Sequence, residues 1–298
     1  MSLDGFSMSA LAHELADALT GGRIDKINQP NKQSVILSVR QPGKNFLLYI
    51  NTNASNPSAH LIEAAPENPA EPPTFVMLLR KQLETGRIAA VRQERRDRIL
   101  HLDIDIIAGG GRIVTRTLTL ELIGKYSNII LHEGGTIIEA LRRIGENSSR
   151  VRTVFKGIPY TLPPAQDKYD LFAADIDDIA ARVRNAGEAK IFQALISAVL
   201  GFGPVSAKEV CFLAGLAPNI PVSQLDPSDF DALSAALTEV RAWMEQPAPS
   251  LRLDANGKVA AMAAFPLSRL AGTTILSYPT VSALMIDADR RLGSYVIP

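Results

Sequence analysis

The sequence predicts an α+β fold in which a mostly antiparallel sheet is interrupted by an all-helical segment. Between residues 34 and 132, short segments of alternating apolar and polar residues are separated by turns rich in glycine and proline, which is typical of antiparallel strands. From about residue 175 to residue 246, apolar residues instead recur every three or four positions, as they do in amphipathic helices. Strand-like segments return at residues 251–253 and 259–265, on either side of an Asp-Ala-Asn-Gly turn.

The composition is that of an ordinary globular protein. The chain has 298 residues, of which 46% are hydrophobic and 21% are charged, a length typical of two domains. No apolar run reaches the ~20 residues of a membrane span. The amino terminus has no basic residue before its apolar stretch, so we expect no signal peptide, no membrane partner and a cytoplasmic location. One cysteine and four scattered histidines cannot build a Cys/His cage, so we expect neither a metal nor a cofactor.

The first predicted elements are a helix and a hairpin. Apolar residues three or four positions apart predict the helix over residues 11–19, which Ser7 or Ser9 can cap and two consecutive glycines end. Residues 34–40 and 45–51 predict the hairpin, because a Pro-Gly turn separates them.

A second helix and three further strands follow. Residues 74–84 come after a proline-rich segment and carry one apolar face, which predicts a helix. The period then changes to two, and residues 98–107, 112–122 and 127–132 predict strands joined by glycine-rich turns. In the middle strand, leucines alternate with threonines and Glu121, so one face is buried and the other is polar.

The helical segment is expected to be a separate domain inserted into the α+β domain. Prolines around residue 163 and at residues 247–249 flank it as linkers would. We place the domains at residues 1–170, 171–246 and 247–298. The strands that return in the third part are expected to rejoin the first sheet.

The net charge of zero hides two basic islands. Residues 80–98 contain seven basic and three acidic residues, and residues 142–156 contain five basic residues and Glu146. Islands of this size either bind nucleic-acid phosphates or form a solvated charged face. The second island consists of Arg142, Arg143, Arg150, Arg152 and Lys156.

Motifs of catalysis are missing from the sequence. It has no Walker loop, no dinucleotide-binding glycine pattern, no nucleophile elbow and no zinc-protease motif. Asp103 and Asp105 could hold a divalent ion or act as an acid and a base, but their spacing favours the exposed side of an alternating strand. Cys211 lies among apolar residues and is expected to be a small buried side chain. The four histidines share no spacing, and we assign none of them a catalytic role.

A glycine-hydrophobic-glycine turn predicts a helix-hairpin-helix in the helical segment. Gly201 and Gly203 let the backbone turn sharply, and the free N–H groups that begin the second helix can hold a phosphate oxygen. We therefore expect a phosphate contact at Gly201, Gly203 and the nearby Lys208. The same geometry also serves as a protein–protein scaffold.

A charged pair, Asp97 and Arg98, follows Arg95 and Arg96 at the start of a predicted strand. An arginine fork can grip a phosphate or a base edge while an adjacent carboxylate orients it or accepts from a base amino group. An ordinary turn with charged residues has the same spacing, so both interpretations stay open.

Five segments resemble the NFACT family, also called fibronectin-binding-protein-A-like, and occur in the family's order. They are GGRIDKINQP, PPTFVMLLRKQLETGRI, RDRIL, ELIGKYSNIIL and GFGPVSAKEV. The resemblance implies an amino-terminal domain similar in fold to that of the formamidopyrimidine-DNA glycosylases, with an inserted helix-hairpin-helix domain. Family members continue into a coiled coil, so we expect this chain to be an amino-terminal fragment.

The resemblance also implies a function in ribosome-associated quality control. Bacterial members of the family bind a large ribosomal subunit blocked by peptidyl-tRNA and recruit tRNA, chiefly that for alanine. A tail is then added to the stalled chain without a template. The ribosome performs the peptide transfer, so the resemblance implies that the protein is not an enzyme.

The resemblance assigns tRNA binding to two groups of residues. The first group is the family's Asp-Arg pair and the arginines before it, and the second matches the family's Glu-x-x-Gly-Arg-His-Ser-Asn motif. Lys125 and Tyr126 stand where Arg and His are common, and the lysine keeps the charge but loses the bidentate geometry. The residues assigned are Arg95, Arg96, Asp97, Arg98, Glu121, Gly124, Lys125, Ser127 and Asn128.

Three other functions are weighed against this one. A glycosylase needs a proline nucleophile after the initiator Met, an adjacent acid and a zinc finger, and the chain instead has Ser2, Leu3 and a single cysteine. A surface adhesin with fibronectin as its partner fits the older family name but needs export. A scaffold whose helical domain binds protein and no RNA is the third alternative.

Overall fold

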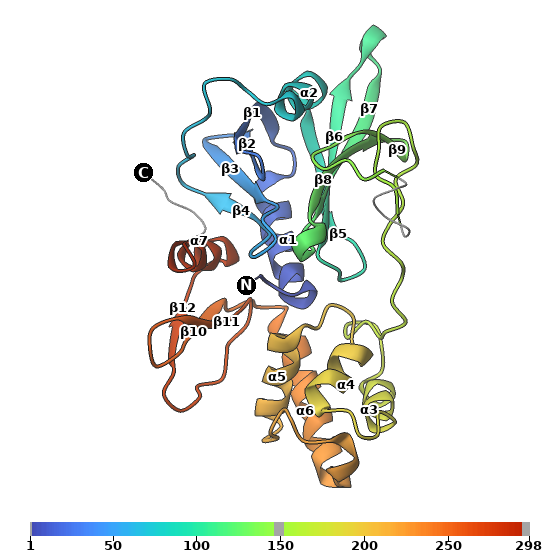
Figure 1. The fold of residues 1–298 in the computed structure, drawn as a ribbon, viewed down its shortest axis with the longest axis vertical. Helices are drawn as coiled ribbons and strands as arrows, with labels where there is room; N and C mark the ends of the chain where they lie inside the picture. The colour runs from blue at the N-terminus through green and yellow to red at the C-terminus, as the bar shows by residue number, and fades with distance from the viewer. Residues whose placement is uncertain (1, 146–151, 294–298) are drawn as a thin grey trace.

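The computed structural model describes residues 2–145 and 152–293 and has an α+β fold (Figure 1). A nine-stranded antiparallel sheet has the strand order β4-β3-β2-β1-β5-β6-β7-β8-β9, and a smaller sheet has the order β11-β10-β12. The large antiparallel sheet that the sequence predicts is therefore confirmed. No helix within residues 2–145 and 152–293 is long and apolar enough to cross a membrane.

The nine-stranded sheet consists of two meanders joined at one short contact. Between β1 and β5 the register contains the pair Arg23 and Arg87, and the Ile24 N–H donates to the Gly86 carbonyl at 2.8 Å. The strands are β1 (Arg23–Asn31), β2 (Ser34–Gln41), β3 (Lys44–Asn51), β4 (Ser58–Ile62), β5 (Arg87–Gln93), β6 (Ile99–Ile107), β7 (Ile113–Glu121), β8 (Asn128–Glu133) and β9 (Thr136–Ala140). The predicted hairpin and the three predicted strands correspond to β2, β3, β6, β7 and β8.

Helix α1 (Gly5–Leu19) contacts β4 of one meander and β5 of the other (Figure 1). Its buried residues include Phe6, Leu11 and Leu15. The expected cap at Ser7 or Ser9 is wrong. The helix begins after Asp4, whose carboxylate accepts the Ser7 N–H at 2.9 Å, while the Ser9 hydroxyl donates to Gln93. Asp4 takes this role because an N-cap side chain must precede the first helical turn.

The second predicted helix is present as α2 (Thr74–Leu83), with an apolar face on β1. Four helices follow the sheet along the chain, and α5 packs between its neighbours α4 and α6. They are α3 (Ile176–Arg184), α4 (Ile191–Ala198), α5 (Pro204–Leu213) and α6 (Pro227–Trp243). The division of the chain into three domains stays a prediction.

One apolar cluster connects the sheet, the four helices and the small sheet. The ring of Phe6 in α1 lies 5.7 Å from the ring of Phe172, 5.2 Å from that of Phe202 and 5.8 Å from that of Phe265. These rings come from the segment before α3, the turn before α5 and the strand region after β11. Phe6 therefore links α1 to the helical segment and to the region of the small sheet.

The returning strands do not rejoin the first sheet, and that expectation is wrong. The strands β10 (Ser250–Leu253), β11 (Val259–Ala263) and β12 (Thr274–Ser277) form a sheet of their own. Contacts already cover the edge of β4, because helix α7 (Val281–Arg291) packs on it and the Ser282 hydroxyl accepts the Leu61 N–H at 3.0 Å. At the other edge, the Ile137 N–H of β9 donates to the Ile158 carbonyl.

Candidate nucleic-acid interface

The turn between β5 and β6 has a strained backbone. Arg95 and Arg96 have φ values of +44° and +56°, and the Asp97 N–H donates to the Glu94 carbonyl at 2.7 Å. This is the geometry of a type I′ turn, in which Asn and Gly are the usual central residues. Two arginines in left-handed conformation cost about 1–2 kcal/mol each, so the surroundings must hold the turn in place.

Contacts from three distant segments hold this turn. The Arg96 guanidinium lies 3.3 Å from the Asp170 carboxylate and 4.3 Å from the centre of the Phe172 ring. The Arg96 carbonyl packs against two glycines, since a Cβ added to Gly5 would lie 2.0 Å from this oxygen and one added to Gly201 would lie 2.7 Å from it. Only glycine fits at either position without movement of the turn.

The side chain of Gln93 ties the turn to α1. Its amide nitrogen donates to the Gly5 carbonyl at 2.7 Å and to the Asp97 carbonyl at 2.9 Å, and its oxygen accepts from the Ser9 hydroxyl at 2.6 Å. The backbone of Asp97 is therefore fixed before any ligand binds. Its carboxylate accepts the Arg98 N–H at 2.7 Å.

Two of the predicted groups meet in one cleft of about 370 Å³. The Asp-Arg pair and Arg95 line one side, and the glycine turn before α5 lines the other. Lys168 adds a cation, and burial lowers its pKa against the opposing effect of Asp97. Among the lining residues are Arg95, Asp97, Arg98, Lys168, Gly201 and Gly203.

The carboxylate of Asp4 occupies the start of α5, where we expected a phosphate at Gly203. It accepts the Gly203 N–H at 3.0 Å and the Ser206 hydroxyl at 2.5 Å. An internal anion thus uses the helix terminus that the glycine pattern suggested for a ligand. The expected contact at the Gly203 N–H is corrected accordingly. Lys208 lies 5.2 Å over the Phe192 ring and does not line the cleft.

The second group of residues assigned to tRNA lies at the connection between β7 and β8 and contains both buried and exposed side chains. Ser127 and Asn128 are buried, and each bonds to backbone: the Ser127 hydroxyl donates to the Gly124 carbonyl at 2.7 Å, and the Asn128 amide donates to the Arg142 carbonyl at 2.8 Å. Lys125 is exposed on the same connection. Ser127 and Asn128 therefore shape this connection, while Lys125 faces solvent.

The polar side of β7 is covered by the chain segment that leads to Tyr160. Glu121 is 3% exposed and its carboxylate accepts from Arg152 at 2.6 Å and from the Tyr160 hydroxyl at 2.9 Å. The Tyr160 ring stacks on the His132 ring at 4.7 Å. Glu121 therefore holds a buried ion pair within the protein.

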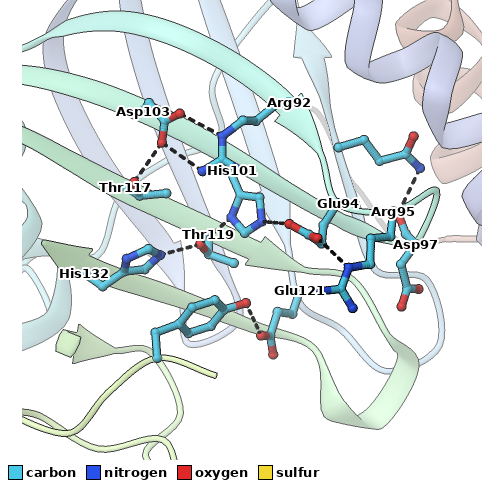
Figure 2. A network of polar contacts seen from close by, with 12 residues as sticks. Arg92, Glu94, Arg95, Asp97, His101, Asp103, Thr117, Thr119, Glu121 and His132 are labelled. Atoms are coloured by element: carbon cyan, nitrogen blue, oxygen red, sulfur yellow. Dashed lines mark hydrogen bonds and ion pairs between the residues drawn. The ribbon is translucent and has the colours of Figure 1, made fainter. Parts of the chain in front are cut away.

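A chain of polar contacts continues from His132 to the strained turn (Figure 2). The Thr119 hydroxyl lies 2.9 Å from His132 Nε2 and 2.8 Å from His101 Nδ1. His101 Nε2 lies 3.2 Å from Glu94, whose other oxygen lies 3.2 Å from Arg95. Burial lowers the pKa of His132 to about 4, and burial together with Arg92 lowers that of His101, so both rings are neutral at pH 7.

Sequence reasoning missed this network, although a signal was present. His101 and Thr119 are directly paired across β6 and β7, as are Asp103 and Thr117. Polar residues at facing positions on two strands indicate a hydrogen-bonded layer.

The two basic islands are partly neutralised by ion pairs among the residues that the structure describes. In the first, Arg92 pairs with Asp103, Arg95 with Glu94 and Arg96 with Asp170. In the second, Arg143 pairs with Glu139 and Arg152 with Glu121, while Arg150 and Glu146 lie outside the described residues. The number of cations in these islands is therefore larger than the number available to contact phosphates. Arg98 and Lys168, which line the cleft, become the stronger candidates for such contacts.

The other sequence candidates have structural roles. Asp103 accepts from Arg92 and Thr117, and Asp105 accepts from Thr115 at 2.7 Å. Cys211 is buried, and burial raises the pKa of its thiol to about 12. Within the described ranges, no group of three or more His, Cys, Asp or Glu side chains is arranged to hold a metal ion.

Comparisons with known proteins agree with the segments noted in the sequence. The model of the NFACT N-terminal and middle domains matches residues 4–287. The Rqc2 homolog RqcH of Bacillus subtilis is 37% identical over 243 residues, which are 81% of this chain and 41% of the relative. The chain thus spans less than half the length of that relative.

Solved structures agree over almost the full chain. The fibrinogen binding protein from Staphylococcus aureus superposes with a TM-score of 0.79 at 27% identity, covering 95% of this chain and 97% of that one. The N-terminal part of the fibronectin/fibrinogen-binding protein from Streptococcus suis gives a TM-score of 0.77 at 27% identity, covering 98% and 99%. A formamidopyrimidine-DNA glycosylase from Lactococcus lactis reaches only 0.37, so the expected likeness to that fold stays a prediction.

The family match, the relative and the ordered segments point the same way, and we conclude that this chain belongs to the NFACT family, with its N-terminal and middle domains at residues 4–287.

Proposed function

We propose that this chain acts in ribosome-associated quality control and binds tRNA through the cleft beside the β5–β6 turn. In this proposal it binds a large ribosomal subunit blocked by peptidyl-tRNA and recruits tRNA, chiefly that for alanine. The ribosome then extends the stalled chain without a template. The protein itself catalyses no reaction, works in the cytoplasm and needs no cofactor.

One observation carries the proposal. The pair Asp97 and Arg98 lies at a strained turn that three separate segments hold against a cleft. Strain of this kind persists where the surrounding structure maintains it, and it is concentrated at functional sites. Hydrogen bonds hold the backbone of Arg98, whose N–H donates to the Asp97 carboxylate and whose carbonyl accepts the Leu122 N–H. An arginine presented in this way beside a carboxylate can contact both phosphate and a base edge.

The glycine turn before α5 is proposed to contribute as a helix-hairpin-helix. It lines the same cleft as Arg98, so an RNA strand bound there would pass Gly201. Because Asp4 already accepts the Gly203 N–H, we expect this turn to shape the cleft more than to bind phosphate. Lys208, over the Phe192 ring, would contribute only to the long-range field.

A second candidate function is binding of fibronectin or fibrinogen, which the descriptions of the Staphylococcus aureus and Streptococcus suis proteins favour. One way in which an extended partner binds is by adding a strand to an open sheet edge. Here α7 covers β4, and the segment ending at Tyr160 bonds along β9, since the Tyr160 N–H donates to the Gly135 carbonyl at 2.7 Å. The outer strands of the nine-stranded sheet are therefore already in contact with other segments, which argues against an adhesin that adds a strand there. A scaffold whose helical segment binds protein without RNA stays an alternative.

Cosedimentation tests the proposed function. Large subunits that carry peptidyl-tRNA, and empty subunits as the reference, are centrifuged with the protein and labelled tRNA. We expect the protein to pellet labelled tRNA with blocked subunits, and Asp97→Ala/Arg98→Ala to pellet less tRNA. Arg112→Ala, which removes an exposed arginine at the far end of the β6–β7 hairpin, is the matched control. If the protein is retained on immobilised fibronectin and no pellet contains tRNA, the proposal is contradicted.

A further inference from the structure

His101 of β6 is a buried histidine with a partner at each ring nitrogen (Figure 2). It is 3% exposed and lies directly opposite Thr119 in the register of β6 and β7. Its Nδ1 lies 2.8 Å from the Thr119 hydroxyl, and its Nε2 lies 3.2 Å from the Glu94 carboxylate. His101 is not among the residues that line the cleft beside the β5–β6 turn, so its influence on that cleft has to pass through Glu94.

The contacts determine where the protons lie on His101 and on His132. The Glu94 carboxylate can only accept, so His101 Nε2 carries a proton and donates it. In the neutral ring Nδ1 is then an acceptor, and the Thr119 hydroxyl donates to it. The oxygen of Thr119 in turn accepts from His132 Nε2 at 2.9 Å. The three hydrogen bonds therefore run in one direction, from His132 to Glu94.

This arrangement requires that His101 is neutral, and its surroundings keep it so. Burial and then the charge of Arg92, which lies opposite it in β5, lower the pKa of His101. Glu94 and Asp103 act in the other direction, but the net shift is downward. A protonated ring would donate from both nitrogens and would reverse the Thr119 hydroxyl. At pH 7 the ring therefore has one donor, which faces Glu94.

Glu94 connects His101 to the strained turn. Its other carboxylate oxygen lies 3.2 Å from Nε of Arg95, which lines the cleft. Because this contact uses Nε, the terminal nitrogens of the guanidinium stay available for a phosphate. The Arg95 side chain is 55% exposed, so without an anchor it would lose rotamer entropy when RNA binds. Glu94 provides that anchor while its own carboxylate is held by His101.

We propose that His101 is a positioning residue for the RNA cleft, which as the Nε2–H tautomer fixes Glu94 and thereby holds Arg95 ready for a phosphate. This inference rests on the proposed tRNA binding and adds to it a buried residue that does not contact RNA itself. Loss of the Nε2 donor should weaken tRNA binding, while a side chain that donates from the same place should preserve it.

Histidine ¹⁵N spectra of the free protein test the tautomers without RNA. We expect His101 and His132 both to have a protonated Nε2 and a bare Nδ1 at pH 7. His13, which is exposed to solvent, provides the reference signal in the same spectrum. A His101 ring that is protonated at Nδ1 would overturn the proposal.

Binding of labelled total tRNA, followed by fluorescence anisotropy, tests the positioning. The amide nitrogen in His101→Gln lies about where Nε2 lies and can donate to Glu94, whereas the shorter side chain in His101→Asn does not reach it. We expect His101→Asn to weaken binding on the order of fivefold. His101→Gln should bind like the wild type. Both variants bury an amide in place of the ring, so rescue by glutamine separates the hydrogen bond to Glu94 from a general loss of packing.

Thr119→Val and Thr117→Val are a matched pair on one face of β7. Thr119 contacts His101, whereas Thr117 donates to Asp103 at 2.7 Å. We expect only Thr119→Val to weaken tRNA binding, and this variant also tests the proposal if His101→Asn does not fold. If the wild type binds tRNA and Thr119→Val or folded His101→Asn binds equally well, the positioning role is overturned while the proposed function stands. The same holds if His101→Gln is as weak as His101→Asn. If the wild type binds no tRNA, both proposals fall.

Discussion

The carboxylate of Asp4 accepts the backbone N–H of Gly203 at 3.0 Å, across a separation of 199 positions in the sequence. The same carboxylate caps α1 through the Ser7 N–H and accepts from the Ser206 hydroxyl. One side chain therefore closes the start of two helices that border the proposed RNA cleft. This contact also explains why the glycine turn before α5, which we propose to be a helix-hairpin-helix, need not bind a phosphate at the Gly203 N–H.

Replacement of Asp4 tests this junction. Asp4→Ala removes three accepted hydrogen bonds at once, so we expect the free energy of unfolding in urea to fall by about 2–3 kcal/mol. Asp175→Ala is the control, because Asp175 caps α3 alone and accepts one N–H, from Asp177. Its loss should be about 1 kcal/mol. Equal losses in the two variants would show that Asp4 acts as an ordinary cap.

The contact between Gly201 and the Arg96 carbonyl leads to a second prediction. Gly201→Ala introduces a Cβ 2.7 Å from that oxygen, at a φ of +80°. Gly215→Ala has a similar φ of +73° but meets nothing within 4 Å, so it carries the backbone strain alone. We expect Gly201→Ala to lower the free energy of unfolding by about 2 kcal/mol more than Gly215→Ala. Matching urea midpoints would mean that the glycine is not needed for the close approach.

The buried ion pair of Glu121 gives a third prediction. Glu121→Ala deprives Arg152 of this carboxylate in a site that is nearly closed to water, so a loss of about 3 kcal/mol in unfolding free energy is expected. Glu133→Ala breaks the Arg116 pair, in which the glutamate is 42% exposed, and should cost less than about 1 kcal/mol. A Glu121→Ala protein of normal stability that fails to bind tRNA would instead favour a direct contact with RNA.

The fourth prediction concerns the pH dependence of stability at α7. Burial raises the pKa of Asp289 to about 6 and lowers that of the neighbouring His60 to about 3. His60 is thus neutral and Asp289 is ionised at pH 8. Because the folded state binds the Asp289 proton more tightly than the unfolded state, the stability it contributes is complete below pH 4 and is lost as the pH rises through 6.

Asp289→Asn should remove the loss of stability that accompanies ionisation of Asp289. We expect it to raise the free energy of unfolding at pH 8 by on the order of 2–3 kcal/mol, and to leave it almost unchanged at pH 4. Asp287→Asn in the same helix is the opposite case, since hydrogen bonds from Tyr278 and Arg291 lower the pKa of Asp287 despite its partial burial. That variant should be less stable than the wild type at pH 8. A gain of equal size at both pH values for Asp289→Asn would rule out ionisation as its cause.

Elements whose signal is local could be predicted from the sequence. The hairpin of β2 and β3 and the strands β6 and β7 follow from alternation and from glycine or proline at the turns. Contacts between distant segments could not. Neither the pairing of Asp4 with Gly203 nor the covering of Glu121 by Tyr160 leaves a pattern in nearby residues.

The candidate site shows the same division. The sequence singled out both Asp97 and Gly201, but it could not show that they line one cleft, because the link runs through Gly5 and the Arg96 carbonyl. It also assigned Glu121 to RNA, although burial gives this carboxylate an internal partner. Asp97 and Gly201 line the cleft, whereas Glu121 is buried. This difference depends on contacts between distant segments, so the periodicity of one strand does not reveal it.

The most direct test of the account is the binding of purified protein to total tRNA across a salt series, with Asp97→Ala/Arg98→Ala beside the wild type. The account predicts that the wild type binds with an affinity that falls steeply with salt, and that the double variant binds more weakly with a slope smaller by about one. Arg112→Ala, with its arginine far from the cleft, should match the wild type except for a slight loss at low salt. Wild-type binding that does not depend on salt, or a double variant that binds as well as the wild type, would contradict the assignment of this cleft to tRNA.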